Sequence, residues 1–278
     1  MNRFLKLVNF EVNRFLRIYL VLIGITILFQ MIAVITSSRE YLSRVDDLIY
    51  RGSMPKKMFL DQYGTFTLFD VTNNSLWFIS PIFLSIAALI FYVFFIWYRD
   101  WFGKNTFIYR LLMLPTDRMN VYLAKFTTIL LFVFGLVALQ LLLLPLEGQV
   151  VKWMVPNEFY SDMTIYEIIK NNIILSLIIP RSFFEFVLAY GIGITAVLIV
   201  FTAVLFERSF RLKGIIYGII YCALSLFIFL LPILVDVFVL RYYFYPIELF
   251  IIEVVVILLL LAGALWIGSY LIRNKIRV

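Results

Sequence analysis

Residues 98–125 read YRDWFGKNTFIYRLLMLPTDRMNVYLAK and lie between two long apolar segments. The apolar side chains of the run FIYRLL, at 107–112, fall on one side of a helix because residues three and four apart share a face. Pro115 ends this helix, and Asp117 is placed to cap the next one. A helix this short cannot cross a bilayer. We therefore expect it to lie on the membrane or to dock into a partner, positioned by the rest of the chain.

The composition is that of a membrane protein. Hydrophobic residues make up 64% of the chain and charged residues 15%, whereas about a quarter of a soluble domain is charged. Apolar runs of 18 or more residues recur, which predicts an all-α polytopic membrane protein. The single cysteine, Cys222, excludes a disulfide within the chain, and the absence of histidine removes the commonest metal ligand and general base.

We expect one transmembrane domain over residues 1–278. Its six predicted spans cover residues 18–36, 78–97, 121–146, 183–206, 214–235 and 247–272. Residues 1–17 carry polar and apolar side chains on opposite arcs, the pattern of a helix lying in the membrane interface. Two longer polar segments, 37–77 and 147–182, join spans on the other side.

The charges of the connections determine the orientation. The side with both termini, 98–125 and 207–213 has fifteen Lys and Arg against four acids, a net charge of +11. The other side has nine cations and thirteen acids, a net charge of −4. Because cytoplasmic loops carry an excess of Lys and Arg, we expect both termini in the cytoplasm. The basic excess is then a topology signal, and no nucleic-acid partner is expected.

Motifs for catalysis are absent from the sequence. There is no G-x-x-x-x-G-K-[ST] phosphate loop, no G-x-S-x-G, no H-E-x-x-H and no Cys/His cluster. We therefore predict no catalytic residue, no metal ligand and no cofactor in this chain.

The stretch at 98–125 resembles the region between the second and third spans of type-2 ABC exporter permeases. That family has a charged residue after the second span, a glycine, an amphipathic helix, a run of the form "slLP.sR..i..aK" and then the third span. The corresponding features here are Arg99 and Asp100, Gly103, Leu112–Leu114 with Pro115, Asp117 with Arg118, and Lys125. The six spans, the amphipathic start and the large first outer segment also agree, so the resemblance extends in outline over the whole chain.

This resemblance implies a bacterial cell-membrane exporter with both termini cytoplasmic. Two permease subunits, identical or homologous, would form the path among membrane lipids, and two copies of a separate ABC ATPase would bind ATP and Mg. Residues 105–114 would form the coupling helix that receives the ATPase. The implied coupling residues are Phe107, Ile108, Arg110, Leu111, Leu112 and Arg118. The alternative is a helix that merely rests on lipid.

Several acids map to the outer ends of spans, and Glu253 lies about 9 Å inside the sixth at 1.5 Å per residue. An ionisable group at that depth is a candidate functional site. Glu253, Glu185 and Gln140 are therefore candidates for a substrate path. Alternatively, acids simply prefer the side without the positive excess, and Glu253 pairs with Arg181 or Arg241.

The expected function is export coupled to ATP hydrolysis by the partner, with a peptide, an antimicrobial or a lipid-like compound as substrate. Two other classes fit a six-span chain without an ATPase motif: a secondary transporter, and a non-transporting membrane sensor or assembly factor.

Overall fold

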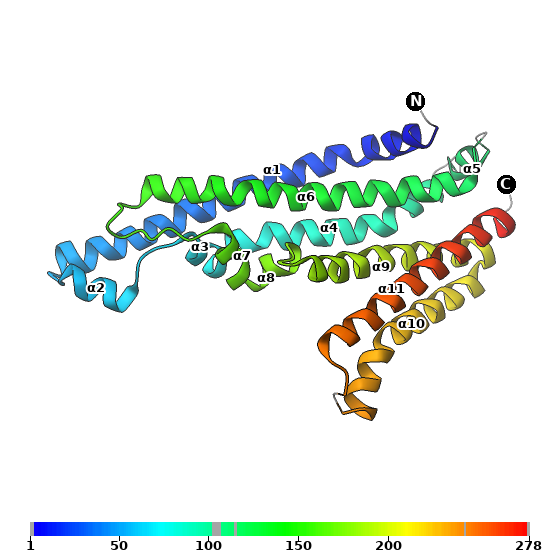
Figure 1. Cartoon of the computed structure of the whole chain (residues 1–278). Coiled ribbons are helices and arrows are strands. Elements are labelled where there is room, and N and C mark those ends of the chain that lie inside the picture. Colours follow the sequence, from blue (N-terminus) through cyan, green and yellow to red (C-terminus); the bar gives the residue numbers. More distant parts are fainter. Residues whose placement is uncertain (1–2, 102–106, 114–115, 242, 277–278) are drawn as a thin grey trace. The chain divides into compact units, whose positions relative to one another are not determined.

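The computed structural model describes residues 3–101, 107–113, 116–241 and 243–276, except for the side chains of Phe107 and Tyr109. Six of the described helices are long and apolar enough to cross a membrane, as the sequence predicts. They are α1 (Arg3–Val45), α4 (Leu76–Trp101), α6 (Arg118–Met154), α9 (Phe183–Phe210), α10 (Leu212–Leu234) and α11 (Pro246–Tyr270) (Figure 1).

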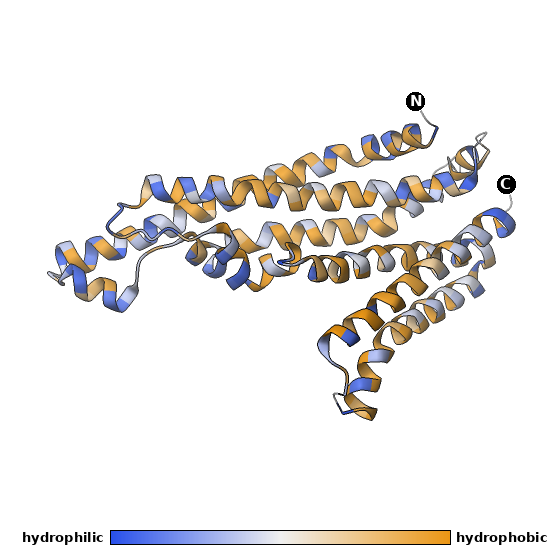
Figure 2. Ribbon diagram, viewed as in Figure 1, coloured by the Kyte–Doolittle hydropathy of each residue, from blue (hydrophilic) through white to orange (hydrophobic). Residues whose placement is uncertain are grey.

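Shorter helices make up most of the connections. They are η1 (Asp46–Arg51), α2 (Lys56–Tyr63), α3 (Leu68–Asn74), α5 (Phe107–Leu112), α7 (Ile165–Asn171), α8 (Ile173–Ile178), η2 (Val235–Val239) and η3 (Leu271–Lys275). Hydrophobic residues follow the long helices, while α2 and several helix ends are rich in hydrophilic residues (Figure 2).

The start of the chain differs from the prediction of a separate interfacial helix. Residues 3–45 form one uninterrupted helix, which joins the amphipathic start to the first predicted span. Two opposite arcs are present, since Leu7, Val8 and Glu11 are buried whereas Arg3 and Lys6 are exposed. Part of the apolar arc is therefore covered by the protein itself, while Leu5 on the same arc remains 51% exposed.

Contacts between residues group the chain into two compact units, whereas we expected one transmembrane domain from the sequence. Unit 1 comprises Met1–Arg14, Leu89–Leu131 and Ser182–Val278, and unit 2 comprises Phe15–Ala88 and Phe132–Arg181. Unit 2 therefore holds both of the long polar segments. Helices α1, α4 and α6 each contribute residues to both units.

Unit 1 is built on α9, which packs against α10 and α11. Arg211, at a φ of 53°, connects α9 to α10 in a sharp turn. Gly214 lies so close to this turn that a Cβ there would be 2.1 Å from the carbonyl oxygen of Phe206. Three fully buried rings, Trp97 on α4, Tyr122 on α6 and Phe201 on α9, contact one another at centroid distances of 5.5–6.1 Å.

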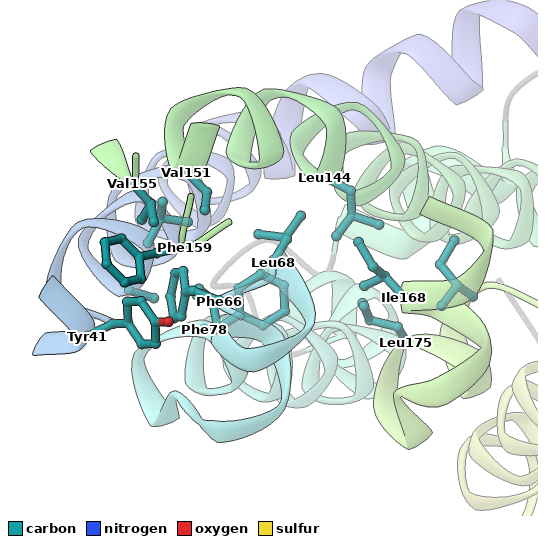
Figure 3. Packing of buried hydrophobic residues seen from close by; sticks show 14 of the residues in the cluster. Tyr41, Phe66, Leu68, Phe78, Leu144, Val151, Val155, Phe159, Ile168 and Leu175 are labelled. Atoms are coloured by element: carbon teal, nitrogen blue, oxygen red, sulfur yellow. The ribbon is translucent and has the colours of Figure 1, made fainter. Parts of the chain in front are cut away.

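Unit 2 has its own hydrophobic core, to which the short helices and the far ends of α1 and α6 contribute. Tyr41, Phe66 and Phe159 lie together at one end of this core (Figure 3). A short backbone bridge closes it, in which the amide of Phe66 donates to the carbonyl of Phe159 at 2.8 Å. Asn172 caps α8 and donates to the carbonyl of Thr72 at 3.0 Å, joining α8 to α3.

Within unit 2, a buried hydrogen bond joins α1 to α6. Gln30 on α1 donates to Gln140 on α6 at 2.9 Å, a numbering offset of 110. Residues with the same offset, such as Val34 with Leu144 and Val45 with Val155, are buried in the same core.

Candidate functional site

Three helices of unit 1 bring five charged side chains together beside the 98–125 stretch. This charge cluster consists of Glu11 and Arg14 from α1, Arg99 and Asp100 from α4, and Lys125 from α6. Lys125 Nζ donates to Glu11 Oε1 at 2.7 Å and also bonds Asp100. Arg99 binds Glu11 at 2.8 Å, and Arg14 binds Asp100 at 2.7 Å. Each acid thus contacts the lysine and at least one arginine.

The centre of the charge cluster is inaccessible to solvent. Lys125 and Asp100 are 0% exposed, and Glu11 is 2% exposed. Taking such ions out of water costs several kcal/mol each, and close opposite charges offset that cost only when the geometry is good. The third hydrogen bond of Lys125, to the carbonyl of Ile96 at 3.0 Å, uses its remaining donor. The ammonium also lies 5.3 Å from the centre of the Trp97 ring.

The position of the cluster in the chain gives it a mechanical consequence. Arg99 and Asp100 end α4, and Lys125 lies two turns into α6, so the cluster fastens both ends of the connection that contains α5. The same cluster includes Glu11 and Arg14, near the N-terminal end of α1, so it also ties α1 to this connection.

A second group of contacts joins the end of α4 to α9. Tyr98 donates a hydrogen bond to Glu207, and the guanidinium of Arg208 lies 5.1 Å from the Tyr98 ring and 5.4 Å from the Trp101 ring. Glu207 and Arg208 belong to the basic connection expected at 207–213, most of which continues α9 as a helix. Glu207 and Arg208 therefore make contacts within the protein.

The apolar face of α5 is buried within the chain. Ile108 is 0% exposed, and Leu111 and Leu112 are also buried. The resemblance implied that Phe107, Leu111 and Leu112 fill a groove of the ATPase. Leu111 and Leu112 are covered within this chain. Periodicity identified correctly that they share a covered face, but the chain itself covers it. The exposed residues are Arg110 and Met113, and the predicted contact of Phe107 lies outside the described side chains.

Arg118 also makes its described contacts inside the chain. It donates to the carbonyl oxygens of Ile272 and Ile276, at 3.3 and 3.0 Å, which lie beyond the end of α11. The sequence prediction had placed it against acids of a partner. Its neighbour Asp117 caps α6 as predicted and bonds Arg273. The backbone amide of α6 and then Arg273 hold the pKa of Asp117 below its usual value.

The three residues predicted for a substrate path have different surroundings. Gln140 is buried in unit 2, where its Oε1 accepts from Gln30, while its Nε2 has no hydrogen bond to any described residue. Glu185 is exposed in the first turn of α9, where its amide donates to Ser182. Glu253 on α11 is 6% exposed, and neither carboxylate oxygen has a hydrogen bond to any residue that the structure describes. The described contacts include no ion pair between Glu253 and Arg241.

A further buried acid was not selected from the sequence. Glu147 on α6 is 0% exposed, and both of its oxygens lack a partner in the part of the chain that is described. Ser38 on α1 likewise has a buried hydroxyl without a hydrogen bond to any described residue. The sequence ends the third predicted span at residue 146 and assigns Glu147 to the outer segment, whereas α6 continues through Pro145 to Met154.

The described residues contain no group of three or more Cys, Asp or Glu side chains placed to hold a metal ion. Comparison of the chain with protein families, with curated proteins and with solved structures finds no match in any of the three.

Proposed function

We propose that the chain is the membrane-spanning permease subunit of an ATP-driven exporter and works with a separate ATPase. The charge cluster carries this proposal. An ion network of this size at the end of three helices is costly to bury, and it joins both ends of the α5 connection to α1. Such a connection is suited to carrying a displacement of α5 into the helices. The resemblance of residues 98–125 to the coupling region of type-2 permeases points to the same function.

The burial on α5 changes the proposed contact with the ATPase. Among the described side chains, Arg110 on α5 and Met113 directly after it are exposed, and they form the docking surface that we propose, with an acidic partner site opposite Arg110. The buried leucines would stabilise the position of α5 rather than enter the partner. A second permease copy, membrane lipid, and ATP with Mg held by the partner complete the proposed complex in a bacterial cell membrane.

The test is co-purification of the tagged chain from its native membranes with an ATPase. We expect a protein with a phosphate loop to be recovered in fixed proportion, together with ATP hydrolysis. Arg110→Glu should reduce its recovery several-fold, because a carboxylate would then face the acidic site. Arg39→Glu is the matched control, since Arg39 is an exposed arginine of unit 2. Equal recovery with both variants, or active transport by the chain alone, would disprove the proposal.

One observation favours a second candidate, a proton-coupled secondary transporter. Glu147 and Glu253 are both buried in long apolar helices without a described partner, and buried acids of this kind serve in proton relays. The two functions differ in their energy source. Transport in vesicles that continues without ATP and stops when a protonophore collapses the proton gradient would favour the second candidate.

A further inference from the structure

A cavity of about 700 Å³ opens in unit 2 beside the first turn of α4. Its walls come from the later part of α1, the end of α2, α3 and the start of α4. The residues that decide its chemistry are Glu40, Tyr41, Tyr63, Phe66, Asp70 and Trp77. A volume of this size is within the usual range for small-molecule sites.

Four aromatic residues, Tyr41, Tyr63, Phe66 and Trp77, line the cavity together with hydroxyl, amide and charged side chains. Tyr41 stacks on Phe66 with ring centres 4.9 Å apart, so these two rings support each other and are largely buried. Tyr63 and Trp77 are 47% and 51% exposed, which leaves their surfaces accessible. Trp77 lies at the start of a membrane-length helix, a position at which tryptophan marks the boundary between lipid and water. Its ring also contacts Phe29 on α1 at 5.4 Å.

The charges that line the cavity leave one acid uncompensated. Arg44 is bound to Glu40 one turn away on α1, so these two charges cancel. Asp70 has no ion pair among the described residues. Its Oδ2 accepts from the amide and hydroxyl of Thr67 at 2.8 and 2.7 Å, and those bonds cap α3. The hydroxyl of Tyr41 donates to the carbonyl of Gly64 at 3.0 Å instead of to Asp70.

We propose that this cavity binds an alkylammonium group at the membrane surface. Accessible tryptophan and tyrosine faces attract an organic cation through their ring quadrupoles, and they suit quaternary ammonium in particular. Asp70 supplies the opposite charge. Arg44 is the one cation among the lining residues, and Glu40 already binds it. The described residues also contain no group of three or more Cys, Asp or Glu side chains placed to hold a metal ion. The zwitterionic head group of a lipid and a free cationic amphiphile share this chemistry.

Tetraethylammonium is a suitable probe because it is soluble and carries the proposed group without an acyl chain. The full-length chain would be reconstituted in phosphatidylglycerol nanodiscs, which contain no ammonium, and titrated calorimetrically. We expect saturable binding. Asp70→Asn should weaken it about five- to tenfold by removing the charge, and Trp77→Leu should weaken it about two- to fivefold.

Asparagine retains an oxygen that can accept from Thr67, so the cap of α3 is preserved in the Asp70→Asn variant. The matched control is Asp61→Asn, which neutralises an exposed acid of α2 that does not line the cavity. Unaltered binding by both the Asp70 and the Trp77 variant, or an equal loss with the Asp61 variant, would overturn the proposal. Absence of saturable binding to the wild-type chain in every lipid would overturn it as well.

The same titration distinguishes the two sources of the ammonium group. In nanodiscs of phosphatidylethanolamine or phosphatidylcholine, a lipid head group that occupies the cavity would compete and weaken tetraethylammonium binding. Equal affinity in all three lipids would identify a free amphiphile as the ligand. This inference does not rest on the proposed ATPase partner, because the cavity lies wholly in unit 2 and the experiment requires neither ATP nor a second protein.

Discussion

Replacing Lys125 by methionine tests the charge cluster most directly. Methionine has a similar length but no charge and no donor. In the structure, Lys125 Nζ bonds Glu11 Oε1 at 2.7 Å, the carbonyl of Ile96 at 3.0 Å, and Asp100. The substitution removes all three bonds. The carboxylates of Glu11 and Asp100 stay buried, but the cation that they shared is lost.

The expected loss follows from what remains. Removing one partner of a buried ion pair costs about 3–5 kcal/mol. After the substitution, Glu11 still binds Arg99 at 2.8 Å and Asp100 still binds Arg14 at 2.7 Å. Because neither acid is left without a cation, we expect the lower end of that range, about 3 kcal/mol of unfolding free energy.

The assay is denaturant unfolding of the purified chain in mixed micelles, with Asp100→Asn alone and combined with the Lys125 variant. The losses of unfolding free energy in the two single variants should sum to about 0.5–3 kcal/mol more than the loss in the double variant, since both residues belong to one network. The control is Lys57→Met at an exposed, unpaired lysine of unit 2, with a change within about 0.5 kcal/mol. Full stability of the Lys125 variant, or strictly additive losses, would refute the network.

Glu147→Gln should leave the unfolding free energy unchanged or raise it at pH 7, because it removes an ionisable group that is buried without a partner; a loss above about 1 kcal/mol would reveal a partner for the carboxylate. Gly214→Ala should cost about 1–3 kcal/mol through its clash at the α9–α10 turn. At Gly193 an added Cβ meets nothing within 4 Å, so Gly193→Ala should instead stabilise α9. Equal changes of the unfolding free energy in the Gly193 and Gly214 variants would contradict the described turn. Since the pKa of Asp117 is lowered in the folded chain, its stabilising effect is present above the ordinary value of 3.8 and is lost as the pH falls through the lowered one. The difference in unfolding free energy between wild type and Asp117→Asn should therefore shrink on acidification. A difference independent of pH would contradict stabilisation by the contact between ionised Asp117 and Arg273.

The six long helices could be predicted because the thickness of a bilayer fixes the length of an apolar span. Their ends could not be predicted in the same way. Helices α1 and α6 continue well into the polar segments, to Val45 and Met154, because polar residues can propagate a helix when one of its faces is buried. Hydropathy reports where lipid ends, which is a different position from where a helix ends.

Local signals at single positions were reliable. Asp117 caps α6, as expected from the sequence. The apolar positions of α5 do share a buried face. Periodicity reports only that a face is covered, so it could not distinguish a cover made by the chain itself from one made by a partner.

The charge cluster could not be predicted because it depends on the relative register of three helices. One signal was present, however. Glu11 lies on the apolar arc of residues 1–17, where an acid requires a nearby cation. Arg14, three residues later, was the local candidate, and it lies 3.7 Å away. The closer cations, Arg99 and Lys125, come from helices about ninety residues or more further along the chain.

The buried acids divide into two groups with different physical requirements. Glu11 and Asp100 are surrounded by cations of the chain, so their charges are compensated by the fold and serve to hold helices together. Glu147 and Glu253 have no described partner, so a charged carboxylate at either position would be destabilised by burial in an apolar helix. Each must either carry a proton or receive a cation from outside the described chain. Glu11 and Asp100 therefore stabilise the packing of the helices. Glu147 and Glu253 are the two acids at which transport of a cation or a proton would depend on the carboxylate.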